Sequence, residues 1–240
     1  MLSQWTIGRI KVSSIREYYG PTHPASELFP DLDRALLARH HSWLAPKHYV
    51  PSLDCLVVAI QIWICEVDDK VIVIDTGVGN RKNRTAERMH QLNTLFMHWA
   101  AAAGATRERV THVALTHLHN DHVGWNTIRV DGRWEPTFPN ATYYMPERDL
   151  EFIRAHVATG DPLYRDALGD SIEPILDSGL ARMLTTQTEI ADVLRIAPAP
   201  GHTPGQLNFW IESQGEHGVF SADVLHHPIQ MYQPDCNSVA

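Results

Sequence analysis

The chain carries the stretch Thr116-His117-Leu118-His119-Asn120-Asp121-His122-Val123-Gly124-Trp125, which places three imidazoles and one carboxylate within six positions. The mostly apolar run at residues 110–115 precedes it and predicts a buried strand. Four such side chains are costly to place at a strand end unless a positive charge binds them. The stretch therefore predicts a metal site rather than a polar surface loop.

The spacing of these side chains offers ligands for two ions. Residues two apart in an extended chain share a face, so His117 and His119 can hold one ion together. The turn-forming residues that follow bend the chain, so that Asp121 and His122 can face a second position. Imidazole and carboxylate ligands without a thiolate suit zinc best, with iron, manganese or cobalt as alternatives.

At these residues the chain resembles the metallo-β-lactamase superfamily, whose signature is His-x-His-x-Asp-His. Three further segments match the family in the same order, and the resemblance covers most of the chain from about Leu56 onward. They are the strand and turn Val71-Ile72-Val73-Ile74-Asp75-Thr76-Gly77, the segment Ala199-Pro200-Gly201-His202-Thr203-Pro204-Gly205, and the strand end Phe220-Ser221-Ala222-Asp223.

The resemblance implies a binuclear site. His202 would be the third ligand of the first metal, beside His117 and His119, and Asp223 would bridge both ions. The family adds a last histidine to the second metal from a later loop, but only seventeen residues follow Asp223. His226 and His227 come too soon to match that position. Either the chain is a truncated copy that lacks its C-terminal end, which we favour, or its second site is incomplete.

The pattern of elements predicts an α+β fold. Strands and hairpins, then a helix, then a metal loop occur twice, which fits two β-sheets packed face to face with helices outside. The resemblance implies an αββα four-layer sandwich with two mixed sheets. With 240 residues and 44% hydrophobic content, the chain predicts one domain over residues 1–240.

Several elements can be placed individually. We expect a strand over residues 5–15, a loop over 18–30, a short helix over 31–41 capped by Asp31, and a hairpin of 56–65 with 71–74. Apolar residues at intervals of three and four predict a helix over 86–103. Further expectations are a hairpin around Asp131-Gly132, a strand over 141–145, a helix over 147–158, helical pieces over 161–179, and a hairpin of 206–211 with 218–221.

Charge and hydropathy exclude several classes of protein. A formal net charge of −8 argues against a nucleic-acid partner, because phosphate contacts need clustered Lys and Arg. The sequence contains neither a signal peptide core nor an apolar run long enough to span a membrane, which predicts a cytoplasmic protein. Cys55 and Cys65 are expected to be small buried side chains rather than a disulfide or a metal pair. The oligomeric state is left open.

The predicted function is metal-dependent hydrolysis. A hydroxide that bridges two divalent cations would attack the substrate, and Asp121 would accept a proton and return it to the leaving group. The motifs resemble the branch with quorum-sensing lactonases and organophosphate hydrolases, which predicts a lactone or related ester as the small-molecule substrate. The alternatives are a phosphotriester or thioester hydrolase of the same fold, or a non-catalytic metal-binding module. Tyr144, His156 and Tyr164 are candidates for lining the site.

Overall fold

The structure is a computed structural model that describes residues 2–185 and 187–239. Contacts divide the chain into two compact units. The first comprises the residues up to Glu17 together with Gln61–Ala222, and the second comprises Tyr18–Ile60 together with the residues from Asp223 onward. The sequence gives no sign of this division, because β2 (Ile10–Pro24) and β4 (Cys55–Val67) each cross the boundary without a linker.

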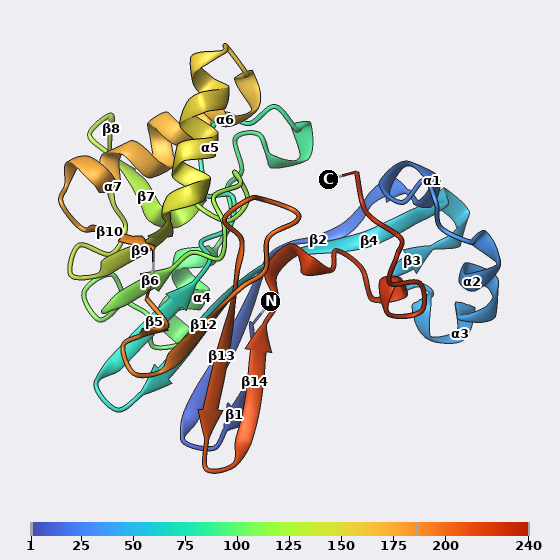
Figure 1. The fold of residues 1–240 in the computed structure, drawn as a ribbon, viewed down its shortest axis with the longest axis horizontal. Helices are drawn as coiled ribbons and strands as arrows, with labels where there is room; N and C mark the ends of the chain where they lie inside the picture. The colour runs from blue at the N-terminus through green and yellow to red at the C-terminus, as the bar shows by residue number, and fades with distance from the viewer. Residues whose placement is uncertain (1, 186, 240) are drawn as a thin grey trace. The chain divides into compact units, whose positions relative to one another are not determined.

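A large mixed sheet forms the centre of the first unit (Figure 1). Its strand order is β1-β2-β4-β5-β6-β9-β10. β5 pairs with β6, β6 with β9 and β9 with β10 in parallel, whereas β1 with β2 and β4 with β5 are antiparallel. Besides β2 and β4, the strands in this order are β1 (Leu2–Ile7), β5 (Lys70–Ile74), β6 (His112–Ala114), β9 (Thr142–Pro146) and β10 (Ala181–Leu184).

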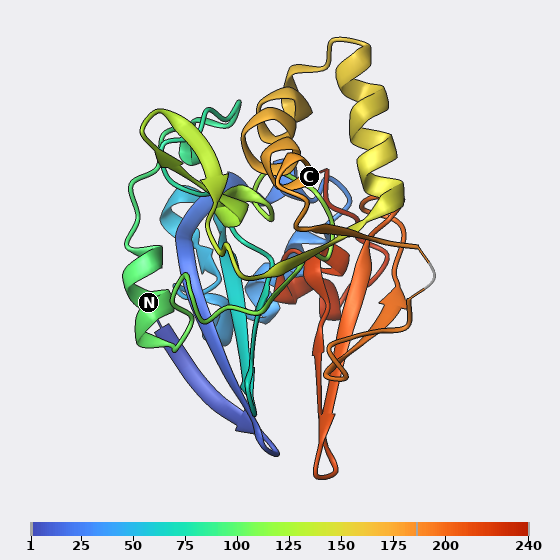
Figure 2. The same cartoon turned by 90° about the vertical axis from the view of Figure 1, so that its left-hand side faces the viewer.

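A second, antiparallel sheet packs against one face of the large sheet. Its order is β11-β12-β13-β14, and it appears in orange to red in Figure 2, apart from the blue and green strands of the large sheet. Its strands are β11 (Glu189–Ile190), β12 (Leu194–Pro198), β13 (Leu207–Ser213) and β14 (Glu216–Phe220). One buried apolar cluster joins the two sheets, with Ile72 and Ile74 from β5 against Phe209 and Ile211 from β13.

Helices cover the other face of the large sheet. A second cluster joins Val71 and Val73 of β5 to side chains of α4 (Phe96–Ala102), α5 (Glu147–Ala158), α6 (Pro162–Ala167) and α7 (Glu173–Asp177). Because successive residues of β5 enter different clusters, this strand is buried on both faces. The arrangement confirms the predicted α+β class with two packed sheets and outer helices. The prediction of two mixed sheets holds for the large sheet only.

The predicted helix over residues 86–103 is wrong in its first half. Only η2 (Glu87–Met89), a 3₁₀ turn, and α4 are helical there. The backbone between them bonds to the preceding loop instead: Arg81 N donates to Leu92 O over 2.9 Å, and Gln91 N to Lys82 O over 2.8 Å. These hydrogen bonds to another segment override the helical periodicity. The sequence does not reveal such bonds.

Most other predicted elements of the first unit are present. The hairpin at Asp131-Gly132 joins β7 (Thr127–Val130) to β8 (Arg133–Pro136), and both turn residues have positive φ, 47° and 84°. α5 has the predicted bounds, and the pieces after it are α6, the π-helix η4 (Leu168–Ile172) and α7. The expected strand over 5–15 is a hairpin that turns at Gly8, where φ is 55°.

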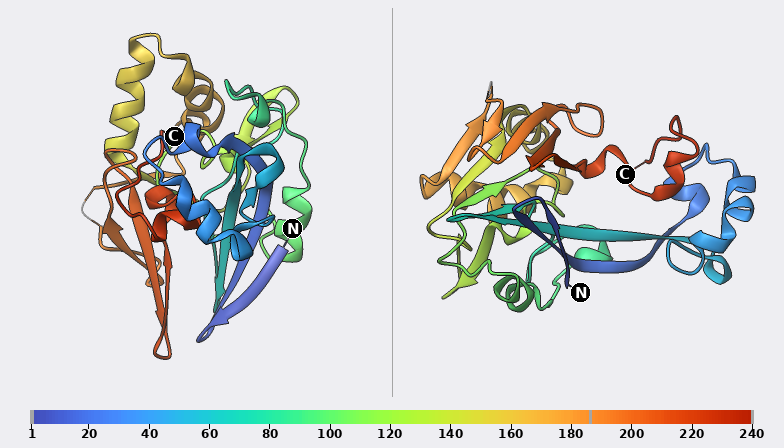
Figure 3. Two further views of the ribbon diagram at one scale, coloured as in Figure 1. Left: turned by 90° about the vertical axis from the view of Figure 1, so that its right-hand side faces the viewer. Right: turned by 90° about the horizontal axis from the view of Figure 1, so that it is seen from below.

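The second unit has its own small core. It contains α1 (Ala25–Leu28), α2 (Arg34–Arg39), α3 (His41–Leu44), β3 (Tyr49–Val50), η1 (Pro51–Leu53), most of η5 (Ala222–Val224) and η6 (Pro228–Met231). The red C-terminal segment lies beside the blue helices in Figure 3. Ile229 and Cys236 of this segment belong to one buried cluster with Phe29 and Leu44.

Two predictions for this unit are wrong. The loop expected over 18–30 begins as strand β2, which extends to Pro24, and continues as α1. The helix α2 is capped by Asp33 rather than Asp31, because the Asp33 carboxylate accepts from Ala35 N over 2.9 Å. Cys55, Cys65 and Cys236 are free, and Cys65 is buried as expected, whereas Cys55 is only half-buried. Within residues 2–185 and 187–239, no helix has the length and apolar character needed to cross a membrane.

His227 is a buried hydrogen-bonding residue of the second unit. Its Nδ1 accepts from Ile229 N over 3.2 Å, which leaves Nε2 to donate to His48 O over 2.8 Å. This pattern requires the neutral imidazole, because a protonated ring has no acceptor. Burial lowers the pKa of His227 to about 4.

Acidification is therefore expected to destabilise the chain through His227. The folded pKa lies below the unfolded value of about 6.5, so stability is present above pH 6.5 and is lost as the pH falls toward 4, by up to about 3 kcal/mol. Denaturant unfolding at several pH values measures this loss. His227→Gln should flatten the dependence, and His217→Gln, at an exposed position, should not. An unchanged pH dependence in His227→Gln would contradict the assignment.

Candidate metal centre

The parallel strands bring three chain segments to one edge of the large sheet. β5, β6 and β9 run in the same direction, so the residues after their carboxyl ends meet there. Asp75 follows β5, His117 comes three residues after β6, and Asp149 lies in the first turn of α5, directly after β9. The segment between β12 and β13 carries His202 to the same place, where Leu207 N donates to Thr116 O over 2.8 Å.

Three imidazoles converge at this edge. One nitrogen each of His117, His119 and His202 lie within 4.8 Å of one another, and Nε2 of His202 is 2.8 Å from Nδ1 of His119. The ring centroids are 4.5 to 4.9 Å apart. His117 is buried, and the other two are half-buried. A set of three imidazole nitrogens fits a divalent ion such as zinc.

Asp121 and His122 lie beside this set. The ring centroid of His122 is 3.9 Å from that of His117, and its Nε2 is 3.9 Å from Oδ1 of Asp121. Its Nδ1 is 2.9 Å from Oδ2 of Asp75, whose carboxylate also accepts from Thr116 N and Oγ1. Asp75 therefore orients His122 so that Nε2 remains available for a metal, which is the usual role of such a carboxylate.

The backbone of the metal loop is pinned to the turn after β5. Thr76 N donates to His122 O, and Gly124 N to Gly77 O, each over 2.7 Å. A Cβ on Gly124 would collide with the backbone of Val78. Glycine is therefore required where the two segments cross, and the crossing fixes the height of the loop above the sheet.

Asp149 is a central residue of the site that the sequence analysis missed. Its buried carboxylate accepts from Leu118 N over 3.1 Å, from Thr203 Oγ1 over 2.9 Å and from Gly205 N over 2.6 Å. One side chain thus ties the loop of His117 and His119 to the loop of His202. In the sequence, Asp149 resembles an acid placed to complement a helix dipole, so nothing distinguishes it.

Asp223 is the one predicted ligand that the contacts assign to the second unit. It begins the C-terminal segment of that unit, and its Oδ2 is 3.4 Å from Nε2 of His226. Its role as a bridging ligand stays a prediction. His227 uses both ring nitrogens in the second unit, which supports its exclusion as a ligand.

Of the three residues suggested as lining, Tyr164 is next to the imidazoles. Its ring centroid is 5.9 Å from that of His119 and 5.5 Å from that of His156. Burial raises the pKa of Tyr164, so its phenol stays protonated at neutral pH and can donate a hydrogen bond. Tyr144 instead belongs to the cluster between the sheets and stacks on His112.

Comparison with known proteins agrees with this geometry. The sequence model of the metallo-beta-lactamase superfamily matches residues 55–235, which is most of the chain. The chain belongs to the metallo-β-lactamase superfamily. The match includes every residue predicted to bind metal.

Among solved structures, this superfamily member is similar to the hydrolase AbOPH of the beta lactamase superfamily. The two are 21% identical, with a TM-score of 0.77 over 98% of this chain and 78% of the other. It is also similar to AidC, a dizinc quorum-quenching lactonase, at 21% identity and a TM-score of 0.71 over 94% and 75% of the two chains. A probable metal-dependent hydrolase from Staphylococcus aureus matches at 17% identity and a TM-score of 0.73, over 92% and 75%. At these identities the likeness shows the fold.

A match to a curated protein covers a smaller share of both chains. The uncharacterized protein YobT of Bacillus subtilis is 24% identical over 151 residues, which is 62% of this chain and 56% of that protein. This chain therefore spans a little over half the length of that relative.

Proposed function

We propose that this metallo-β-lactamase superfamily chain is a metal-dependent hydrolase that cleaves a lactone or a related carboxylic ester. The observation that carries the proposal is the convergence of three imidazole nitrogens within 4.8 Å, with Asp121 and His122 alongside. The likeness to a dizinc lactonase supports the substrate class. A cytoplasmic location and a small-molecule substrate remain predictions.

The residues divide between two metal positions. His117, His119 and His202 would hold the first divalent ion, and Asp121 and His122 the second, with Asp223 proposed as the residue shared by both. Zinc suits these nitrogen and oxygen donors, and iron, manganese and cobalt are alternatives. When bound, such ions lower the pKa of water and polarise a carbonyl oxygen.

The chain itself contributes positioning and proton transfer. Hydrolysis adds one water across the acyl C–O bond and gives a carboxylate, an alcohol and a proton released to solvent. The carboxylate and the alcohol stay in one molecule when the substrate is a lactone. The half-buried Asp121 carboxylate can accept the proton of the attacking water and return it to the departing alcohol oxygen. The Tyr164 phenol would donate a hydrogen bond to the substrate, which its position next to His119 supports.

Hydrolysis assays on the metal-loaded protein test the proposal. Acyl-homoserine lactones, a phosphotriester and a glutathione thioester represent the three candidate substrate classes, and the chelator-treated protein is the control. We expect the lactones to be hydrolysed fastest, and only with metal present. Inactivity on all three would contradict the proposal. Metal stoichiometry separates the hydrolase, which needs two ions per chain, from a non-catalytic metal-binding module with one or none.

A further inference from the structure

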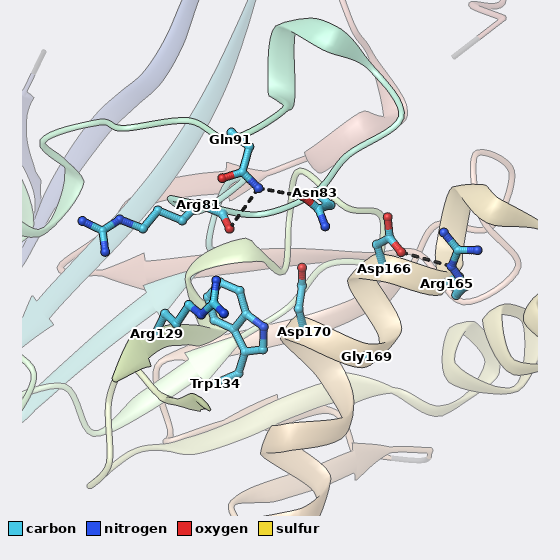
Figure 4. Close-up of a pocket in the computed structure, with 9 residues that line it drawn as sticks. All are labelled: Arg81, Asn83, Gln91, Arg129, Trp134, Arg165, Asp166, Gly169 and Asp170. Atoms are coloured by element: carbon cyan, nitrogen blue, oxygen red, sulfur yellow. Dashed lines mark hydrogen bonds and ion pairs between the residues drawn. The ribbon is translucent and has the colours of Figure 1, made fainter. Parts of the chain in front are cut away.

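The first unit contains a pocket of about 510 Å³ that shares no lining residue with the metal centre (Figure 4). Its walls come from the loop after β5, the β7–β8 hairpin, α6 and η4. The metal chemistry proposed above makes no use of it. Its polar lining includes Arg81, Asn83, Gln91, Arg129, Asp166 and Asp170.

Both carboxylates of the pocket are already paired with cations. Asp166 is 3.1 Å from Nε of Arg165, and Asp170 is 2.8 Å from Nη1 of Arg84 and 3.4 Å from Nζ of Lys82. Lys82 and Arg84 are buried behind the pocket and share the single carboxylate of Asp170. In a chain with a net charge of −8, this pocket is therefore a local region of positive charge, which favours an anion.

Arg81 and Arg129 are the two lining cations without a carboxylate partner among residues 2–185 and 187–239. Of these two, Arg129 lies against an aromatic ring of the pocket. Its guanidinium carbon lies 5.9 Å from the ring centroid of Trp134, which is half-buried. Figure 4 shows these two side chains on one side of the pocket and Asn83 and Gln91 on the other, whereas the Arg81 side chain extends away. The buried Lys82 ammonium lies 3.8 Å from the centroid of the same ring. A guanidinium beside an aromatic ring thus stands opposite two side-chain amides.

The backbone of the pocket wall departs from relaxed geometry at three places. Arg81 and Gln91 both have a positive φ, 59° and 52°, and residues 168–172 form a π-helix. Left-handed non-glycine residues and π-helical turns are both found often at functional sites. The two left-handed residues are held by the hydrogen bonds to Leu92 and Lys82 described above, so the wall is fixed before a ligand arrives.

We propose that this pocket binds a small organic anion that has a planar apolar part, such as an aromatic carboxylate. The Arg129 guanidinium would pair with the carboxylate through two parallel hydrogen bonds. The Trp134 ring would stack on the planar part, and Asn83 would donate from the opposite wall through Nδ2. Gln91 fixes Asn83 in place, because its Nε2 donates to Asn83 Oδ1 over 2.6 Å. The site is separate from the metal centre and does not depend on the proposed hydrolysis.

Calorimetric titration with benzoate at low ionic strength tests this assignment. We expect saturable binding of benzoate, weaker binding of acetate, which lacks the ring, and still weaker binding of benzyl alcohol, which lacks the charge. Arg129→Gln should weaken benzoate binding about tenfold or more, because a charge-assisted hydrogen bond is lost. Arg129→Lys keeps the charge but not the two parallel N–H donors, so its benzoate affinity should lie between those of the wild type and Arg129→Gln. Trp134→Ala should reduce benzoate to the affinity of acetate.

Two controls place the binding in this pocket. Arg195→Gln removes an exposed arginine of β12 and should leave the affinity unchanged. His202→Ala should also leave the benzoate affinity unchanged, because His202 does not line the pocket. If benzoate bound at the metal centre, this variant would lose the binding. Absence of saturable binding, equal affinity for benzoate and benzyl alcohol, wild-type affinity in both Arg129 variants, or loss of binding in His202→Ala would each overturn the proposal.

Discussion

Replacing His202 by alanine is expected to lower the affinity for divalent metal by at least about 100-fold and to abolish lactone hydrolysis at limiting metal. The change removes one of three imidazoles whose nitrogens lie within 4.8 Å of one another. Loss of a group that merely orients a ligand already costs 10–100-fold in metal affinity or activity, and loss of the ligand itself should cost more. Competition with a chelator of known affinity measures the change.

The matched control is His98→Ala, which removes an exposed imidazole from α4. It should bind metal like the wild type. Equal metal affinity in His202→Ala and His98→Ala would mean that His202 is not a ligand. Because His202 lies in a loop and is half-buried, we expect the His202→Ala chain to fold, and its unfolding curve checks this.

Asp149→Asn is expected to weaken both the metal centre and the fold around it. The carboxylate accepts three hydrogen bonds, from Leu118, Thr203 and Gly205. An amide of the same shape has one acceptor oxygen, so its NH₂ group must face a donor on one side. We expect a loss of roughly 1–3 kcal/mol in the free energy of unfolding, and a metal affinity lower by about 10–100-fold.

Metal affinity distinguishes a positioning role of Asp149 from a merely structural one. Saturating metal should restore much of the activity of Asp149→Asn if the ligands are only displaced. Glu151→Gln, an exposed acid two residues further along α5, is the control and should match the wild type in both measurements. A destabilised Asp149→Asn with unchanged metal affinity would show that the two ligand loops do not depend on this carboxylate.

The part of the site that the sequence predicts is the part encoded within short segments. His117, His119, Asp121 and His122 occur in six consecutive positions, so their proximity follows from local geometry. His202 required the family resemblance, because a histidine between two glycines carries no information about its partners. Asp149 could not be found, because its function depends on two loops that the sequence separates by more than 80 residues.

The errors in the predicted elements also come from contacts with other segments of the chain. The helix expected over residues 86–103 begins only at Phe96, because the preceding backbone bonds to the loop of Arg81 and Lys82. The strand β2 extends through Pro21 to Pro24, where local propensity predicts a loop, because it pairs with β4 in the sheet. In contrast, α5 has the predicted bounds, since Pro146 and a helical repeat define it locally.

Titration with Co(II) tests the central claim most directly, because nitrogen-ligated cobalt absorbs visible light in proportion to the occupied sites. We predict that the wild type develops saturable visible bands and that alanine at His117, His119 or His202 greatly weakens them. If the wild type binds no cobalt, or if the three variants bind it as the wild type does, then these imidazoles do not form a metal centre.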